Sequence, residues 1–546
     1  MQTPLRFFLP SAKAESVYQR LALLVLWLYL LSPMLFQPFL GSGVGRLDNI
    51  YAFNATTSLL WAGSLHFAVR RPLVLHLALA PFYFTTAVDL FLMSNFGARL
   101  SSTFVTIALT NQAEAAEFLS AYARPVALAA SALVLVYLTG LYGIRRLQRQ
   151  NSPWLAAGFA VLLVATYGAV ITREIMLQDR PWDFVLLFAG KETSAPFGAV
   201  FQTGLALHLQ ADAREIQKQR KHSTLGATKA PSADEEIYVW VIGETSRPQS
   251  WSLFGYGRDT TPRLRALPDI IALPDMLTTA PVTDLAVPSM LSLQPITDWP
   301  AIMAQRSIVQ AFNETGFTTY WLTTQKIDRW SGLIPQLATE ASHHRYFEYA
   351  YDGVMLDALR TILDGAPRGG KLFIVLHTLG SHFDAVKRYP PEFSRFDTPG
   401  GTHRQRLVDH YDNSVLYTDW FLSQVIALLS QRPTHAALIY ASDHGENLLD
   451  DEQQLFGHVI GNRYDLSAAA FIWLSPRLRD RHPELAANAK RHATAPLNLS
   501  NLSHSLLDLA GIDATGLDRK LSLFNSSFAP RERWYIVRDE LKKESR

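Results

Sequence analysis

Five long apolar windows occupy the first third of the chain, and none of them carries a charged residue at its centre. Each is long enough to cross the roughly 30 Å hydrocarbon core of a bilayer as a helix. The first window begins too late and runs too long for a cleaved signal peptide. The pattern therefore predicts an α-helical transmembrane domain of five spans over residues 1–172. The windows are Leu21–Leu40, Tyr51–Val69, Pro72–Val88, Pro125–Ile144 and Pro153–Thr172.

Basic residues flank these windows unequally, and Lys and Arg concentrate on the cytoplasmic side of membrane proteins. One set of flanks holds Arg6, Lys13, Arg20, Arg70, Arg71, Arg145, Arg146 and Arg149, and the alternate set holds Arg46, Arg99 and Arg124. This asymmetry predicts a cytoplasmic N-terminus and places everything after the fifth span outside the cytoplasm. The weakest window, Tyr51–Val69, is alternatively a buried helix that does not cross the membrane.

The segment between the third and fourth windows, residues 94–124, is too long for a tight turn. Its stretch TNQAEAAEF puts Thr110, Glu114 and Glu117 on one face of a helix. That face is either solvated on an interfacial helix or lines a lipid headgroup site at the membrane surface.

The pattern changes after a linker-like segment over residues 173–236. From Ile237 onward, short β-rich apolar runs alternate with amphipathic helical stretches. Such alternation predicts a soluble α/β domain over residues 237–546 with a largely parallel central sheet. The best strands are residues 237–244, 318–325, 371–378, 436–443 and 468–475, and the clearest helices are SIVQAFNETG, YDNSVLYTDWFLSQVIALLS and LSNLSHSLLDLAG.

Composition supports a membrane-associated protein and narrows its chemistry. Charged residues make up 18% of the 546 residues, against about 25% in ordinary soluble domains. The net charge of +2 gives no basic field for nucleic acid. The chain has no cysteine, which excludes a disulfide, a thiolate zinc site and a cysteine nucleophile.

Acidic and imidazole side chains gather at the predicted strand ends, where ligands bind in such sheets. Glu244 ends one strand, and Asp443 ends another with His444 directly after it. Two carboxylates beside imidazoles call for a cation, and this mixture suits zinc. The other histidines near these strand ends are His377, His382 and His458.

A hydroxyl group is the available nucleophile if the site performs group transfer. The stretch MLTTAPVTDLAVPSMLSL offers Thr278, Thr279, Thr283 and Ser289. A hydroxyl beside zinc becomes a competent nucleophile because its pKa falls. Spacing alone does not choose among these four residues.

Several motifs, in order, resemble those of bacterial phosphoethanolamine transferases. They are VIGETSRPQSWSLFGYGRDTTP, the threonine segment ending in VPSML, VLHTLGSH, YDNSVLYTDWFL and ASDHGENL. That family consists of membrane-anchored members of the alkaline phosphatase/sulfatase superfamily and includes lipid A-modifying enzymes of polymyxin resistance. The resemblance is closest over residues 237–475, and it implies an alkaline phosphatase/sulfatase-like catalytic domain.

The resemblance also implies roles for individual residues. Glu244, Asp443 and His444, together with Thr283 as the nucleophile, are expected to hold one tightly bound zinc ion. His382 and His458 match histidines around the phosphoryl group or a second zinc, and His377 matches a neighbouring histidine that we assign to substrate binding. Thr110 and Glu114 match headgroup-contacting positions on the membrane side.

A phosphoethanolamine transferase of this kind would take its donor group from phosphatidylethanolamine through a covalent intermediate on Thr283. The expected acceptor is lipopolysaccharide, on lipid A or a core sugar, and we expect a monomer in the bacterial inner membrane with a periplasmic catalytic domain. Thr279 and Ser289 stand where lipid A-acting members usually have cysteines, so periplasmic glucans stay open as acceptors. A phosphoglycerol transferase and a non-catalytic membrane-anchored binding protein are also compatible with the sequence.

Overall fold

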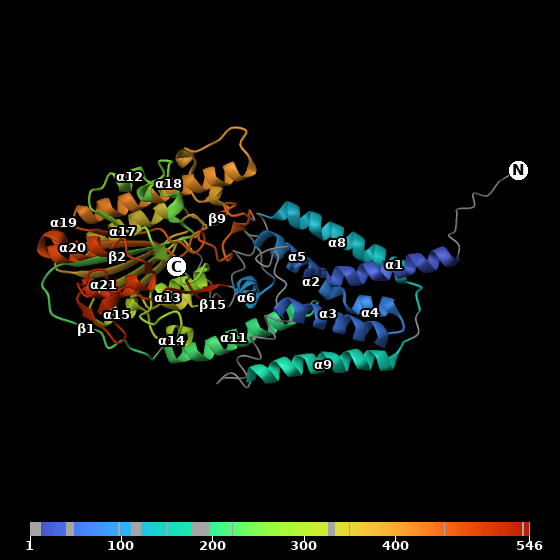
Figure 1. Ribbon diagram of the computed structural model, residues 1–546. Helices are drawn as coiled ribbons and strands as arrows, with labels where there is room; N and C mark the ends of the chain where they lie inside the picture. The colour runs from blue at the N-terminus through green and yellow to red at the C-terminus, as the bar shows by residue number, and fades with distance from the viewer. Residues whose placement is uncertain are drawn as a thin grey trace. The chain divides into compact units, whose positions relative to one another are not determined.

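A computed structural model describes most of the chain and divides it into two compact units (Figure 1). The first unit holds the described residues from Ala12 to Leu109 and from Tyr122 to Leu209, and the second holds Thr110 and the described residues from Gln210 onward. The described residues are 12–39, 49–96, 99–110, 122–148, 151–175, 196–220, 222–325, 333–348, 350–452, 454–537 and 540–544.

The first unit is built from helices. They are α1 (Ala12–Leu30), α2 (Ser32–Phe36), α3 (Asn49–Ala68), α4 (Pro72–Ala78), α5 (Ala80–Phe96), α6 (Ser102–Thr110), α8 (Ala123–Ile144) and α9 (Pro153–Ile175), with α11 (Gly198–Arg220) continuing into the second unit. Helix α1 packs along α8, and α3 packs along α9. Leu26, Leu30, Tyr83 and Ile144 are among the buried residues that join α1, α5 and α8.

Each of the five apolar windows contains helix, but their lengths differ from the prediction. Among the described helices, Val126–Ile144 is long and apolar enough to cross a membrane, and the pair Pro72–Ala78 and Ala80–Asn95, bent by 58°, would add a second span if it counts as one. The apolar stretches Val17–Leu30 and Pro153–Ala169 are shorter. Five spans therefore stay a prediction.

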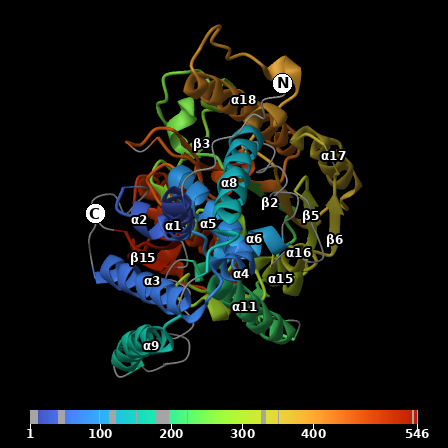
Figure 2. The same ribbon diagram turned by 90° about the vertical axis from the view of Figure 1, so that its right-hand side faces the viewer.

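The second unit is organised by a seven-stranded sheet in the order β3-β11-β8-β2-β7-β5-β6. Its strands are β2 (Glu236–Gly243), β3 (Ile270–Ala272), β5 (Thr318–Thr323), β6 (His343–Tyr346), β7 (Lys371–His377), β8 (His435–Ser442) and β11 (Ala470–Leu474). Strands β8, β2, β7, β5 and β6 pair in parallel, whereas β11 is antiparallel to both β8 and β3. The part of the sheet from β2 through β5 to β6 can be followed in Figure 2. The sheet is thus mixed, with one reversed strand near its β3 edge.

The five predicted strands are present, and two short strands at the sheet edges lie outside the prediction. Strand β6 has the sequence HHRY and is mostly exposed, so it lacks the apolar run that marks a buried strand. Strand β3 has only three residues. Edge strands of this kind carry little sequence signal because they bury little apolar surface.

Helices cover both faces of the sheet (Figure 1). Alternate residues of β2 face opposite sides, as the strand period of two requires. Ile237, Val239 and Val241 pack with α12 (Pro262–Arg265), α17 (Met355–Gly365) and α18 (His403–Ser430). Tyr238, Trp240 and Ile242 pack with α13 (Thr283–Met290), α15 (Ile308–Glu314) and α21 (Ser500–Leu509). Both faces are therefore dry, and polar side chains are concentrated at the strand ends.

Smaller elements complete this unit. They are the helices α14 (Trp299–Ala304), α16 (Ile334–Ala338), α19 (Pro476–Arg481) and α20 (Pro483–His492) and the strands β1 (Thr228–Lys229), β4 (Met276–Leu277), β9 (Asn447–Leu448), β10 (Phe456–Gly457), β12 (Leu497–Asn498), β13 (Ile512–Asp513), β14 (Trp534–Val537) and β15 (Glu540–Lys543). Among the helices, α18 begins with a capping box, in which the Thr402 hydroxyl accepts from the Gln405 N–H and the Gln405 side chain accepts from the Thr402 N–H. This cap fixes where α18 begins, and α18 packs against the turn Ala385–Lys387 that follows His382.

A buried histidine on α21 gives the fold a pH dependence. His504 is 3% exposed, its Nδ1 accepts the Asp518 N–H, and burial lowers the pKa of His504 to about 4. Since the unfolded-state pKa is about 6.5, the stabilisation from the neutral ring is present above pH 6.5 and is lost as the pH falls towards 4. We expect His504→Asn, which keeps an acceptor and removes the titration, to reduce this acid destabilisation by up to about 3 kcal/mol. Thermal unfolding of both proteins at pH 7 and pH 4.5 measures the difference, and an unchanged pH dependence would contradict the assignment.

Candidate metal centre

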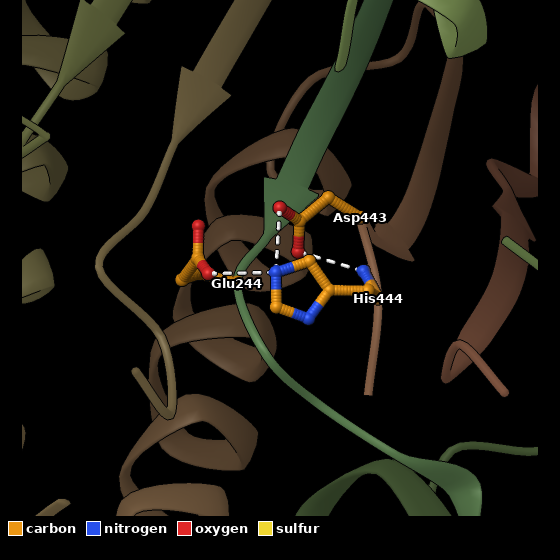
Figure 3. Close-up of side chains that lie close together, drawn as sticks. All are labelled: Glu244, Asp443 and His444. Carbon is orange, nitrogen blue, oxygen red and sulfur yellow. Dashed lines mark hydrogen bonds and ion pairs between the residues drawn. The ribbon is translucent and has the colours of Figure 1, made fainter. Parts of the chain in front are cut away.

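Three side chains that the sequence places at strand ends meet in the structure (Figure 3). Glu244 follows β2, and Asp443 and His444 follow β8, the parallel neighbour of β2 in the sheet. One ligand atom from each residue lies within 4.8 Å of the others. The His444 Nε2 atom lies 3.4 Å from Glu244 Oε1 and 3.5 Å from Asp443 Oδ2. All three residues are at most 1% exposed.

The hydrogen bonds of Asp443 and His444 leave the Oδ2 atom of the first and the Nε2 atom of the second without a partner among the described residues. The Asp443 Oδ1 atom accepts the backbone N–H groups of Thr245 and His444, at 3.1 and 2.8 Å. The His444 Nδ1 atom lies 2.8 Å from the carbonyl oxygen of Gly445, which only accepts, so Nδ1 carries the proton. In the neutral ring, Nε2 then presents a lone pair to two carboxylates.

A divalent cation fits this arrangement. Asp443 Oδ2 and His444 Nε2 are buried and have no hydrogen-bond partner among the described residues. Buried polar atoms without partners are rare because each costs free energy. Two carboxylates and one imidazole are a ligand set that zinc accepts, so the residues present fit the expected ion.

Glu244 is oriented by three donors. The Thr245 hydroxyl donates to Oε1 at 2.5 Å, and the Gln325 Nε2 group donates to Oε2 at 2.5 Å. The Thr283 hydroxyl also donates to Glu244, at 3.2 Å from Oε2. Thr245 and Gln325 are members of the site that the sequence does not predict, because a hydroxyl or amide beside a strand end is common and carries no specific signal.

Thr283 differs from the other hydroxyls of its segment. It is the first residue of α13 and lies against Glu244, where the positive end of the helix dipole favours developing negative charge. The Thr278 hydroxyl donates to the backbone carbonyls of Ala280 and Asp443. The hydroxyls of Thr279 and Ser289 hydrogen-bond to each other. Of the four candidates, Thr283 alone is described as bonding to a side chain of the cluster.

Two of the predicted histidines lie beside the cluster. The His458 ring lies 4.6 Å from the His444 ring and 6.3 Å from the His382 ring, centroid to centroid. The His458 Nδ1 atom lies 3.3 Å from Glu446 Oε2. His458 and His382 therefore border the candidate centre on the side of Glu446.

His377 has a different environment. It ends β7, is 1% exposed, and meets the Trp321 ring edge to face at 5.8 Å. Burial lowers the pKa of His377 to about 4, although Glu244 opposes this effect. The ring is therefore neutral and enclosed, and its assignment to substrate binding stays a prediction.

The two membrane-side residues are not tested by the structure. Thr110 is the last residue of α6, and nothing is described of its side chain. Glu114 lies outside the described residues. Both assignments stay predictions.

Gly380 allows the loop after β7 to approach Glu244. Its φ is +49°, and a Cβ atom there would lie 2.7 Å from the Glu244 carbonyl oxygen and 2.9 Å from the Glu244 nitrogen. We expect Gly380→Ala to cost about 2 kcal/mol or more of unfolding free energy and to lower metal occupancy by displacing Glu244. Gly400→Ala is the control, because Gly400 has φ +70° with open space around it. Chemical denaturation and metal analysis test this, and equal losses for the two variants would show that the close approach is unimportant.

Comparisons with known proteins agree with this fold and site. Residues 236–512 match the sulfatase family. The phosphoethanolamine transferase EptC of Escherichia coli K12 is 26% identical over 461 residues, which cover 78% of this chain and 77% of that protein. The integral membrane lipooligosaccharide phosphoethanolamine transferase A of Neisseria meningitidis has a TM-score of 0.66 at 20% identity, covering 94% of this chain and 98% of that one. The periplasmic domain of E. coli EptC in complex with Zn has a TM-score of 0.54 at 24% identity, covering 59% of this chain and 96% of that domain.

These matches extend over both units of the chain. The fold of that integral membrane protein matches 94% of this chain, and the sulfatase match covers residues 236–512. The chain belongs to the sulfatase family, and the proteins that it is similar to over most of its length are phosphoethanolamine transferases.

Proposed function

We propose that the chain is a membrane-anchored, zinc-dependent enzyme that transfers phosphoethanolamine from phosphatidylethanolamine to a lipopolysaccharide acceptor. The observation that carries the proposal is the Thr283 hydroxyl, which lies 3.2 Å from Glu244 inside a buried Glu–Asp–His cluster. The names of the relatives supply the transferred group. The name of one relative, Kdo(2)-lipid A phosphoethanolamine 7''-transferase, supports lipopolysaccharide as the acceptor.

Glu244, Asp443, His444 and Thr283 would hold the zinc ion. The Zn complex of the E. coli EptC domain supports this choice of metal. When bound there, zinc supplies a Lewis acid that lowers the pKa of an adjacent hydroxyl and attracts the phosphoryl oxygens. One ion is expected, with His382 and His458 available for a second.

The first step is an in-line displacement at phosphorus. The Thr283 Oγ–P bond forms as the bond from phosphorus to the diacylglycerol oxygen breaks, and the Thr283 proton passes to solvent. His382 or His458 donates a proton to the departing oxygen, since their rings lie beside the cluster. Phosphoethanolamine is then esterified to Thr283, and diacylglycerol remains in the membrane.

The second step returns Thr283 to its starting state. An acceptor hydroxyl gives its proton to the histidine that became neutral in the first step and attacks the same phosphorus, the Oγ–P bond breaks, and Thr283 takes a proton from solvent. Lipid A and the core sugars of lipopolysaccharide both offer such groups, and periplasmic glucans are the alternative acceptor. The chain's own contribution is to hold the nucleophile rigidly at the first residue of α13.

We further propose that five spans anchor the enzyme in the inner membrane, with the N-terminus in the cytoplasm and the catalytic domain, residues 237–546, in the periplasm. The bridge over residues 173–236 would join it to the transmembrane domain, residues 1–172. Because the donor is a lipid, anchoring raises its effective concentration at the site. Thr110 and Glu114 would contact its headgroup, and we expect a monomer.

The experiment uses the purified full chain in detergent with zinc and either phosphatidylethanolamine or phosphatidylglycerol. We expect diacylglycerol release and a Thr283 adduct with phosphatidylethanolamine, and neither with phosphatidylglycerol. The acceptor is identified by mass spectrometry of lipopolysaccharide and periplasmic glucans from cells with and without the protein. Release from phosphatidylglycerol alone would replace the proposal with a phosphoglycerol transferase, and no release from either donor would contradict it.

A further inference from the structure

A small cavity is lined in part by Glu446, the glutamate beside His458. It has a volume of about 60 Å³, and its lining includes Ser381, Phe383, Tyr411, Glu446 and Phe456. At roughly 10–15 Å³ for each water-sized position, it has room for about four to six such positions. That is enough for the three non-hydrogen atoms of an ethylammonium group and too little for a sugar.

Two polar side chains of the lining have unused hydrogen-bonding capacity. Glu446 and Ser381 are each 1% exposed, and Glu446 Oε1 and Ser381 Oγ have no hydrogen-bond partner among the described residues. A buried carboxylate oxygen without a partner is costly, and a cation in the cavity would satisfy it. An ammonium group in the cavity would supply the positive charge and would also donate hydrogen bonds to Glu446 Oε1 and Ser381 Oγ.

The rest of the lining suits an ammonium group. The aromatic rings of Phe383, Tyr411 and Phe456 line the same cavity, and ring faces attract ammonium ions. Asp384 adds a second acidic residue, which is paired with Lys387 at 2.6 Å. The guanidinium of Arg247 donates to the backbone carbonyl of Glu446, and it is paired with the carboxylate of Asp450.

Glu446 connects this cavity to the proposed site of phosphoryl transfer. Its Oε2 atom lies 3.3 Å from His458 Nδ1, and the His458 ring lies 4.6 Å from the His444 ring. In phosphoethanolamine, one oxygen and two carbons separate the phosphorus from the nitrogen. A phosphoryl group beside His444 and His458 would therefore have its ammonium group within reach of Glu446.

We propose that this cavity, with Glu446 as its anionic group, binds the primary ammonium of the transferred headgroup and selects it over an uncharged one. The inference rests on the proposed function, since it assumes that phosphorus is bound beside the Glu244–Asp443–His444 cluster. It goes further by naming the group that distinguishes phosphoethanolamine from phosphoglycerol. Glu446 acts here through a contact with the substrate.

The test compares phosphatidylethanolamine with phosphatidylethanol, which has the same ester and no ammonium group, using the full chain with zinc. We expect wild type to prefer phosphatidylethanolamine in kcat/KM, and Glu446→Gln to lower that preference by about tenfold or more, as expected for a charged hydrogen bond. Glu452→Gln, at an exposed glutamate nearby, should leave the preference unchanged. Ser381→Ala should lower it less and serves as the second variant if Glu446→Gln does not fold.

Two results would overturn the proposal. If Glu446→Gln lowers kcat/KM equally for both donors, Glu446 only positions His458. If the preference for phosphatidylethanolamine is unchanged in this variant, the cavity does not bind the ammonium group. A wild type that releases no diacylglycerol would instead contradict the proposed function. In that case, ligand-observed NMR with free ethanolamine, comparing wild type with Glu446→Gln, still tests the cavity, because binding lost in the variant supports it and equal binding contradicts it.

Discussion

Thr283→Ala is expected to abolish phosphoethanolamine transfer, with a residual rate at least about 10³-fold below that of wild type. The reason is chemical, since alanine has no oxygen to form the ester, and direct transfer to the acceptor would need a different geometry. Zinc content should fall little, because Glu244, Asp443 and His444 all remain. Stability should change by less than about 1 kcal/mol, since Glu244 is the one hydrogen-bond partner of this hydroxyl among the described residues.

The measurement combines diacylglycerol release with intact-protein mass spectrometry after incubation with phosphatidylethanolamine. Thr297→Ala is the matched control, because Thr297 is an exposed threonine that follows the same helix. It should form the adduct at the wild-type rate. An active Thr283→Ala protein, or an adduct that persists on another residue, would remove Thr283 from the proposed role.

Asp443→Asn is expected to weaken zinc binding by about 100-fold or more and to abolish transfer with it. The substitution removes one of two anionic ligands. It leaves an oxygen that can still accept the N–H groups of Thr245 and His444, at 3.1 and 2.8 Å. The fold should therefore survive the change. Without metal the variant should even be slightly more stable than wild type, because it relieves the repulsion between Asp443 and Glu244.

Melting temperatures with zinc and with a chelator separate these effects. Zinc should raise the melting temperature of wild type in proportion to the logarithm of its concentration over its dissociation constant, and should raise that of Asp443→Asn much less. Asp480→Asn, at an exposed aspartate, should behave as wild type. If both proteins respond equally to zinc, Asp443 is not a ligand.

The convergence of Glu244, Asp443 and His444 could be predicted because strand direction fixes it. Parallel neighbours bring their carboxyl ends to one edge of the sheet, and β2 and β8 are parallel neighbours. Thr283 could not be chosen from spacing, because the hydroxyls of Thr278, Thr279 and Ser289 lie in the same segment. The hydrogen bonds that distinguish these three hydroxyls from that of Thr283 form only when α13 and the loop before it are folded.

Other features of the structure could not be predicted from the sequence. The reversed strand β11 has five residues, all of them buried, and a buried run of this kind looks the same in either direction. Gln325 reaches Glu244 across a separation of 81 residues, so only tertiary structure brings the two together. Glu446 Oε1 lacks a partner among the described residues because of its tertiary surroundings, and the motif ASDHGENL does not reveal this.

The hydrogen bond between Thr279 and Ser289 has a consequence for how the protein matures. These hydroxyls join the two ends of the segment that carries Thr283, and the chain contains no cysteine. Where a cystine would need an oxidant and a partner enzyme to form, this linkage assembles with the fold itself. The segment that carries Thr283 should therefore reach its native conformation whatever the thiol–disulfide redox potential of its surroundings. Reducing agents added during purification should leave this conformation intact.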